Sequence, residues 1–300
     1  MSEFSSGFWD LYIALLSVIS IVACALFLRS QSVRKPSTLE TTGHQWDGDL
    51  AEYNNPLPRW WSWLFYITIV FSLAYLVLYP GLGSWRGTLG WSQVGQLEEE
   101  QAAAERQFGP LYRKFAAMEV EALAKNPEAL AVGQKLFLNN CAQCHASDGA
   151  GSRGFPNLTD RDWLWGGDAK TIRATISEGR TGMMPPFGAA LGPEGVKNVA
   201  HYVRSLSGLT TDPLRVAFGR ELYQQNCTAC HGAEGKGNPA LGAPNLADKT
   251  WLHGSAEASV IETISGGRTN QMPAHKNLLD EARIHLLTAY VLGLSQGVPK

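Results

Sequence analysis

Two long apolar runs dominate the pattern of hydrophobic and polar positions near the N-terminus of this 300-residue chain. Residues 8–28 are interrupted only by Asp10, and residues 60–82 carry no charge. A helix of about 20 apolar residues spans the hydrocarbon core of a bilayer, so the pattern predicts two transmembrane helices. The first run lacks the basic start and the small-residue cleavage site of a signal peptide, which favours a permanent anchor.

Basic residues set the expected orientation of these two helices. Arg29, Arg34, Lys35 and Arg59 lie between the apolar runs, whereas residues 1–7 contain no basic residue. Short loops rich in lysine and arginine stay on the cytoplasmic side of a membrane. We therefore expect the loop in the cytoplasm, both termini outside, and membrane lipid as a partner.

Beyond residue 88 the apolar positions follow shorter, amphipathic patterns. Residues 89–128 are rich in alanine and charge around a Gly109-Pro110 break, which predicts two polar helices that form a tether. Four amphipathic helices are predicted after it, at 129–140, 194–207, 215–226 and 280–294. The segments between them are rich in Gly, Pro and Asn, as loops are.

These patterns predict an all-α fold with two N-terminal transmembrane helices, a helical tether and two tandem small domains. The expected organisation, from the N-terminus, is a first transmembrane helix with its cytoplasmic loop at 1–59, a second transmembrane helix at 60–88, the tether at 89–128, and domains at 129–208 and 209–300.

The two small domains are indicated by an internal repeat. Gly133 matches Gly219 at an offset of 86 residues, and Pro156-Asn157-Leu158 matches Pro244-Asn245-Leu246 at an offset of 88. Domains of roughly 80 to 90 residues are near the size at which a polypeptide core alone is marginal. A buried group bonded to the chain would supply much of each core.

Each repeat contains one Cys-x-x-Cys-His motif, at residues 141–145 and 227–231. This spacing is typical of covalent attachment of a c-type haem, whose proximal iron ligand is the motif histidine. Half of a zinc site or a redox dithiol would give no reason for the histidine to follow twice. The sequence therefore predicts two covalently bound haem c groups. The expected ligands are Cys141, Cys144 and His145 for one haem and Cys227, Cys230 and His231 for the other.

The sixth iron ligands are expected to be methionines. The repeat pairs Met184-Pro185 with Met272-Pro273, which selects Met184 over its neighbour Met183 and leaves Met183 as a packing residue. His275, three residues after Met272, remains an alternative ligand, whereas His44, His201, His253 and His285 are expected to be surface or packed residues. Ligation by the methionine of the same domain is favoured, and a crossed arrangement stays open.

This ligand set predicts electron transfer. A thioether on the distal side raises the potential and leaves no free position for oxygen. Ionised haem propionates would make residues 129–300 mildly acidic, which permits docking of a basic cytochrome c as electron donor. No nucleic-acid partner is expected.

The whole arrangement resembles the dihaem cytochrome c subunit, subunit III, of cbb3-type cytochrome c oxidases. The resemblance rests on two spans, a loop with Trp46-Asp47-Gly48-Asp49 and Asn54-Asn55-Pro56-Leu57-Pro58, a helical tether, and two Cys-x-x-Cys-His domains with Met-Pro loops. It covers almost the whole chain. A short first span that some relatives have is missing, so two spans fit only part of that family.

The resemblance implies a location and a function. In that family the subunit lies in the bacterial inner membrane with its haem domains in the periplasm. It accepts electrons from a donor cytochrome c and passes them to a monohaem cytochrome c subunit. That subunit feeds a haem-copper catalytic subunit, which reduces oxygen while the complex pumps protons, so the dihaem subunit has no oxygen-reducing site of its own.

Two other classes share part of the pattern. A free-standing membrane-anchored dihaem carrier, serving a dehydrogenase or reductase, would have the same haem chemistry, and only the loop motif and the second span speak against it. A dihaem peroxidase needs an iron with an accessible sixth position, whereas each repeat here supplies its own Met-Pro.

The two motifs should attach haem independently. We expect Cys144→Ala and Cys230→Ala each to leave one covalent haem and the double variant to leave none, because each motif holds its own thiols. Haem staining of a denaturing gel measures this. Full staining of the double variant would exclude covalent haem at these motifs.

Overall fold

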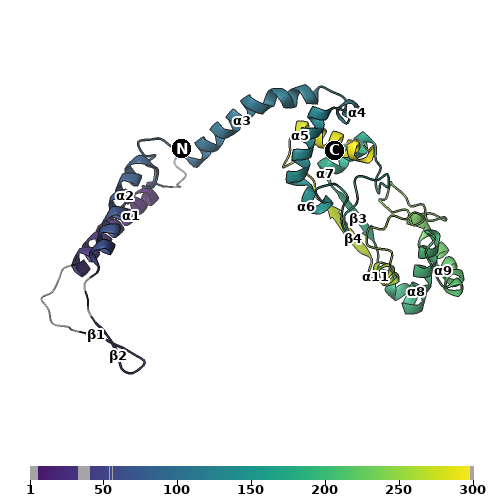
Figure 1. Cartoon of the computed structure of the whole chain (residues 1–300), viewed down its shortest axis with the longest axis horizontal. Helices are drawn as coiled ribbons and strands as arrows, with labels where there is room; N and C mark the ends of the chain where they lie inside the picture. The colour runs from purple at the N-terminus through teal and green to yellow at the C-terminus, as the bar shows by residue number, and fades with distance from the viewer. Residues whose placement is uncertain (1–5, 33–40, 54, 56, 298–300) are drawn as a thin grey trace. The chain divides into compact units, whose positions relative to one another are not determined.

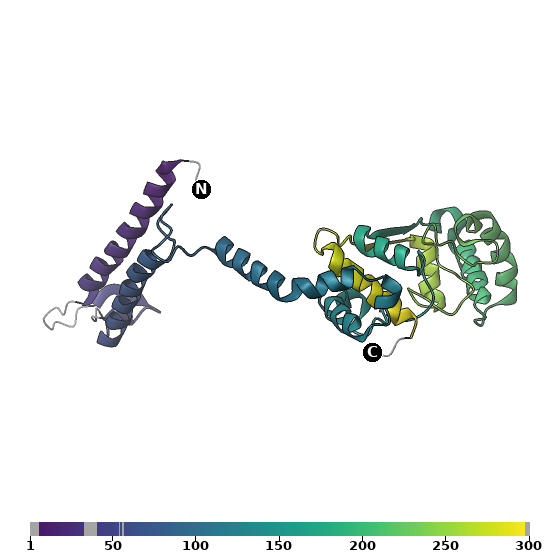
Figure 2. The same cartoon turned by 90° about the horizontal axis from the view of Figure 1, so that it is seen from above.

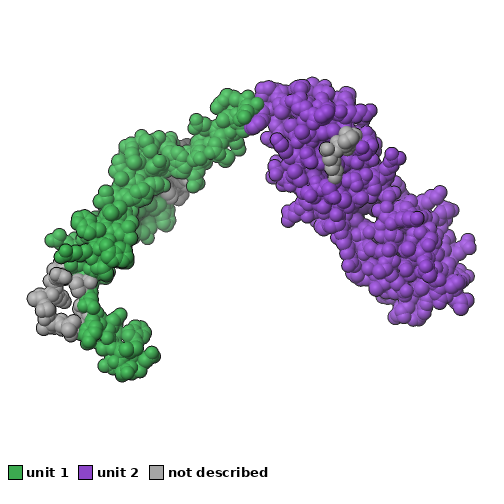
Figure 3. Space-filling model, in the orientation of Figure 1, with its two compact units in different colours: residues 1–107 green, residues 108–300 purple. Residues whose placement is uncertain are grey.

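The computed structural model describes residues 6–32, 41–53, 55 and 57–297, and divides into two compact units, residues 1–107 and 108–300 (Figure 3). The chain is rich in helix, and the described residues form only two small two-stranded sheets. The expected all-α class is therefore confirmed.

Some residues used in the sequence-based predictions fall outside the described ranges. They are Arg34 and Lys35 of the expected cytoplasmic loop, and Asn54 and Pro56 of the loop motif.

Two helices, α1 (Gly7–Ser32) and α2 (Arg59–Leu78), form the candidate membrane anchor of the first unit (Figures 1 and 2). Both are long and apolar enough to span a bilayer, and most of their side chains are exposed. They lie against each other and are joined near both ends. Ser32 Oγ lies 3.1 Å from Ser62 Oγ at one end, and Ser84 Oγ donates to Asp10 Oδ2 at 2.7 Å at the other.

The second helix ends earlier than the apolar run. It stops at Leu78, although the run continues to residue 82, because Pro80 follows Tyr79. A residue that precedes proline avoids the helical conformation, and Tyr79 is extended, with φ −117° and ψ 160°.

The Trp-Asp-Gly-Asp motif forms the tip of a β-hairpin between these helices. Strand β1 (Thr41–Trp46) pairs antiparallel with β2 (Leu50–Tyr53), and Trp46 lies opposite Leu50. Asp47 and Gly48 have φ angles of 50° and 88°. Asp and Gly suit hairpin turns because they adopt this left-handed region most readily.

The tether contains one long helix rather than the two that were expected. Helix α3 (Gln93–Ala116) continues through Pro110. Proline removes one helical hydrogen bond, but the helix is mostly exposed, so water can solvate the freed carbonyl. At its end Phe115 is fully buried, together with Leu123 of α4 (Val120–Leu123). These two side chains join the end of the tether to the haem-domain core.

The remaining helices follow the repeat. The first copy contains α5 (Pro127–Asn140), α6 (Ala142–His145), α7 (Ala169–Glu178) and α8 (Gly188–Leu206), and the second contains α9 (Pro213–Asn226), α10 (Thr228–His231), α11 (Glu257–Gly266) and α12 (Glu281–Ser295). The four predicted amphipathic helices correspond to α5, α8, α9 and α12. Asn126 caps α5 and Asp212 caps α9, each followed by proline at the first helical position.

The last helix of each repeat packs against the helices of the other repeat. Helix α12, from the C-terminus, packs against α4, α5 and α7, whereas α8 packs against α9 and α11. Two hydrophobic cores result. The first contains Phe137 of α5 and Leu287 of α12, and the second contains Val199 of α8 and Tyr223 of α9. We call these the first and second cores.

The domain bounds at 129–208 and 209–300 stay a prediction, but the expected packing of the closing helices differs from the observed one. Helix α8, expected to close the first domain, packs in the second core. Helix α12, expected to close the second domain, packs in the first core. Only about six residues join α8 to α9, and a short connection lowers the entropic cost of packing these neighbours together.

A two-stranded ribbon carries the chain between the two cores. Strand β3 (Arg180–Met184) pairs antiparallel with β4 (Arg268–Met272). In Figure 1 this pair lies between α5 and α6 on one side and α8 and α11 on the other. The chain enters the second core after β3 and returns to the first core after β4.

Glycines allow the two strands to come this close. Gly179 and Gly267 precede the strands with φ angles of 73° and 69°. A Cβ on Gly179 would lie 2.4 Å from the carbonyl oxygen of Met272, and one on Gly267 would lie 2.4 Å from that of Met184. The crossing itself therefore requires the glycine of each repeated Gly-Arg-Thr sequence.

A substitution at one of these glycines should loosen the crossing. We expect Gly179→Ala to lower the free energy of unfolding by about 1–3 kcal/mol, because the new methyl group meets a backbone oxygen at positive φ. Gly182→Ala is the matched control on the same strand, where a Cβ meets nothing within 4 Å. Thermal unfolding of the purified chain measures both, and equal midpoints would contradict this account.

Candidate haem sites

The Cys-x-x-Cys-His motifs begin where α5 and α9 end. Cys141 is the C-cap of α5, and the single turn of α6 brings the backbone N–H of His145 to the Cys141 carbonyl at 3.0 Å. In the second motif the N–H of His231 donates to the Cys227 carbonyl at the same distance. One tight turn therefore holds two thiols and an imidazole beside each core.

The repeated Pro-Asn-Leu sequence fixes the motif histidines. His145 Nδ1 lies 3.0 Å from the Pro156 carbonyl, and His231 Nδ1 lies 3.0 Å from that of Pro244. A carbonyl can only accept, so Nδ1 carries the proton and donates. The lone pair of Nε2 then remains for an iron. The sequence analysis used this repeat to define the domains but did not assign the two carbonyls a role.

Burial keeps both imidazoles neutral. Each histidine is 8% exposed. Burial lowers the pKa of His145 and of His231 below the ordinary value, although the hydrogen bonds to the two proline carbonyls act in the opposite direction. The neutral imidazole is the form that binds a metal.

The buried cysteines remain thiols. Burial raises the pKa of Cys141 to about 11 and that of Cys227 to about 11, with a smaller contribution from the second cysteine of each motif. Disulfide exchange and zinc binding both require thiolates. In the described part of the chain, no group of three or more His, Cys, Asp or Glu residues is arranged to hold a metal ion. The raised pKa values make the Cys141 and Cys227 thiols poor nucleophiles, which speaks against a redox dithiol.

Strand alternation separates Met184 from Met183. Successive side chains of a strand point to opposite faces, so Met184 and Met272 lie on the inner face of the ribbon, where both are partly buried. Met183 points away and is 77% exposed. This arrangement agrees with the choice of Met184 as the candidate ligand, but the expectation that Met183 packs inside is wrong.

Each methionine contacts the core of the other repeat. Met272 packs against the first core together with Cys141, whereas Met184 packs against the second core together with Cys227. The favoured expectation, a methionine from the same repeat, therefore disagrees with the packing. The ribbon carries the end of each strand to the core of the other repeat, so the methionine side chains pack in the crossed arrangement, whereas iron ligation by them stays a prediction.

Most of the other histidines contact protein groups. His253 Nε2 lies 3.1 Å from Asn270 Nδ2, His285 Nε2 lies 2.8 Å from the Met118 carbonyl, and His44 lies near Glu52.

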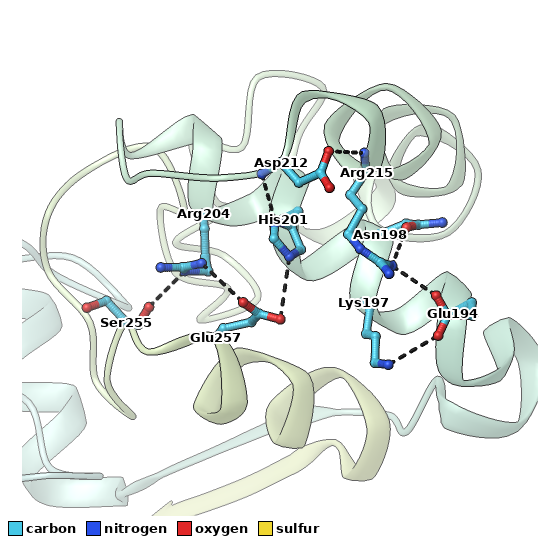
Figure 4. A network of polar contacts seen from close by, with 9 residues as sticks. All are labelled: Glu194, Lys197, Asn198, His201, Arg204, Asp212, Arg215, Ser255 and Glu257. Atoms are coloured by element: carbon cyan, nitrogen blue, oxygen red, sulfur yellow. Dashed lines mark hydrogen bonds and ion pairs between the residues drawn. The ribbon is translucent and has the colours of Figure 1, made fainter.

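His201 belongs to the polar network of Figure 4. Its Nδ1 accepts the backbone N–H of Asp212 at 3.1 Å, and its Nε2 lies 3.4 Å from Glu257 Oε1. The network joins α8 to α11 and to the start of α9, where Arg215 donates to Glu194. It holds the second core together.

The donor sets fit haem c. Each core presents two neighbouring thiols, a neutral imidazole with its Nε2 unprotonated, and a methionine from the ribbon. This is the set that covalent attachment and six-coordinate iron require. The haem-ligand assignments from the sequence stay predictions, and the sequence did not show which methionine packs against which core.

Family models match most of the chain. The model described as cytochrome c oxidase, cbb3-type, subunit III matches residues 128–203 and 215–291. The model described as the N-terminal domain of cytochrome oxidase-cbb3, FixP, matches residues 38–86, which include the hairpin and α2.

Similar proteins carry corresponding names. The chain is 51% identical to the cbb3-type cytochrome c oxidase subunit CcoP of Rubrivivax gelatinosus, over 99% of this chain and 98% of the relative. It is 43% identical to the subunit FixP of Bradyrhizobium sp. strain ORS 278, over 86% and 95%. The subunit CcoP of Cereibacter sphaeroides is 38% identical, over 88% and 97%.

The crossed arrangement can be tested with one haem at a time. In a Cys141→Ala/Cys144→Ala background only the second motif can hold haem. We expect Met184→Ala to abolish the remaining near-infrared methionine–iron band, and Met272→Ala to leave it, because Met184 is the methionine beside Cys227. Met183→Ala is the matched control and should change nothing. The reverse pattern would restore ligation within each repeat.

Proposed function

The chain belongs to the family of cbb3-type cytochrome c oxidase subunit III, and from this membership we propose the route by which it transfers electrons. It accepts them from a donor cytochrome c on two covalently bound haems. It passes them to the monohaem cytochrome c subunit, which feeds the haem-copper catalytic subunit of the same oxidase. That complex reduces oxygen and pumps protons.

The observation that carries this proposal is the pair of complete axial donor sets on one ribbon. His145 with Met272 would hold one iron, and His231 with Met184 would hold the other. Both sixth positions are then filled, so neither iron offers a place for oxygen. Such haems can carry electrons but cannot reduce oxygen themselves.

The ribbon also sets the spacing of the two sites. Met272 is paired with Arg180 at one end and Met184 with Arg268 at the other. The two pairs are four residues apart along each strand, which corresponds to roughly 14 Å at about 3.4 Å per residue. Two haems anchored to one short ribbon lie near each other, as electron exchange within the subunit requires.

The haem, when bound, supplies the reversible change between ferric and ferrous iron. The protein controls how that iron is held. The Pro156 and Pro244 carbonyls fix the tautomer and direction of the motif imidazoles. The methionines of the ribbon favour the ferrous state, and the surrounding apolar side chains of the two cores exclude water.

The two apolar helices anchor the subunit in the bacterial inner membrane. We place the haem domains on the periplasmic side, because the basic residues around the hairpin segment, such as Arg29 and Arg59, favour the cytoplasm. A soluble or anchored donor cytochrome c would then reach the haem domains directly. Mild acidity of the haem-loaded domains would favour a donor with a basic surface.

The two alternatives have less support. A dihaem peroxidase would need one open iron, and both donor sets here include a methionine. The hairpin and α2 match the N-terminal domain of the oxidase subunit. A free-standing carrier would have no need of this region.

Loss of the chain should stop electron delivery while leaving the oxygen chemistry intact. We expect membranes without it to lose oxygen uptake driven by cytochrome c through this oxidase. An artificial small-molecule donor that reaches the catalytic subunits directly should restore part of the uptake. An oxygen electrode measures both, with the wild-type chain supplied in trans as control.

The isolated chain provides the complementary measurement. Purified alone and reduced, it should bind little carbon monoxide, since both sixth positions are occupied. Stoichiometric binding at neutral pH would contradict the electron-transfer proposal and favour the peroxidase-like alternative.

A further inference from the structure

The two methionine loops are equivalent in backbone but differ in one side chain. The offset of 88 residues that pairs Met184 with Met272 also pairs Phe187 with His275. The N–H of Phe187 donates to the Ile264 carbonyl at 2.9 Å, and the N–H of His275 donates to the Ile176 carbonyl at 3.0 Å. The same anchored position therefore holds a phenyl ring in one loop and an imidazole in the other.

These anchors place each side chain beside the core that its methionine serves. Ile176 belongs to the first core, and Ile264 to the second. Phe187 packs against the second core near Met184, as an apolar residue should. His275 accompanies Met272 to the first core, where a ring nitrogen needs a polar partner.

His275 has no such partner among the protein groups. Its Nδ1 is buried and makes no hydrogen bond in the described structure. The backbone around it is fixed, since its carbonyl accepts the N–H groups of Leu278 and Leu279 at 2.9 and 2.8 Å. A buried ring nitrogen without a protein partner is free to bind a ligand that the polypeptide does not provide.

His275 acts electrostatically on the motif histidine His145. The pKa of His145 is lowered first by burial, against the hydrogen bond to Pro156, and a further contribution comes from the charge of His275. No corresponding histidine acts on His231, whose pKa reflects burial and the Pro244 carbonyl. The loop that brings Met272 to the first core therefore also brings a second imidazole beside that core, whereas the loop of Met184 brings a phenyl ring to the second core.

We propose that His275 is a reserve sixth ligand of the first haem iron, which replaces Met272 when the methionine–iron bond opens, and that the second haem has no such reserve. The proposal rests on the crossed ligation proposed above. In the exchange the iron–sulfur bond breaks and an iron–nitrogen bond forms. The imidazole binds in its neutral form, so no electron or proton is transferred.

Oxidation of the iron should bias the exchange. A soft thioether stabilises ferrous iron, whereas imidazole competes better for the harder ferric iron. With His275 bound, the potential of the first haem would fall relative to its methionine-bound form. The reduction potential of the first haem, and with it the driving force for electron transfer, would then depend on which ligand is bound. The second haem would keep one ligand set.

The test compares the two methionine variants in the full chain with both haems attached. In the ferric state we expect Met272→Ala to remain low-spin, with an electron paramagnetic resonance signal typical of two imidazoles. Met184→Ala should instead become high-spin and should bind carbon monoxide when reduced. A high-spin first haem in Met272→Ala, as in Met184→Ala, would overturn the proposal.

Exchange of the two differing residues makes the test specific. Met272→Ala/His275→Phe should lose the low-spin signal and behave like Met184→Ala, because it gives the first site the phenyl ring of the second. A double variant that stays low-spin would show another ligand and overturn the proposal. His275→Phe alone should keep both methionine–iron bands, which checks that the fold survives.

The same spectra separate this proposal from the ligation on which it rests. If Met272→Ala removes one methionine–iron band and leaves a high-spin haem, only the role of His275 fails. If Met272→Ala removes no band although haem staining shows both haems, Met272 is not a ligand and the crossed ligation fails with it.

Discussion

The antiparallel pairing of β3 with β4 is five residues long, yet it decides which helix closes which haem site. The chain passes from the first core to the second along β3 and returns along β4. Each methionine therefore arrives at the core of the other repeat. Gly179 and Gly267 make the pairing sterically possible, because the partner strand's carbonyl oxygen occupies the space of a Cβ at both positions.

The two sides of each haem site are built in different ways. The proximal side is local, since one helical turn and a proline carbonyl 11 or 13 residues later hold the imidazole. The methionine side depends on a contact distant in sequence, because the ribbon brings each methionine from the other repeat. The turn that holds the motif histidine can thus form locally, whereas the methionine contact depends on the complete fold.

Exchange of the closing helices also links the two cores mechanically. Neither core is complete without a segment from the other repeat, so the pair should fold and unfold together rather than as independent domains. Direct contacts add to this coupling. Thr250 Oγ1 donates to Asp162 Oδ2 at 2.6 Å, and the N–H of Gly154 donates to the Leu252 carbonyl at 2.8 Å. These contacts join the loops of the two repeats directly.

The sequence by itself determined the two apolar helices and the repeat, and it predicted the haem motifs and both methionines. Each depends on local spacing: about 20 apolar residues, a Cys-x-x-Cys-His turn, or a shared register. The proximal carbonyl partners could have been found from the repeated Pro-Asn-Leu sequence. Only the tertiary structure decided which core each closing helix and each methionine packs against. The repeat makes α8 and α12 equivalent in position, so the repeat by itself does not show which core each helix covers.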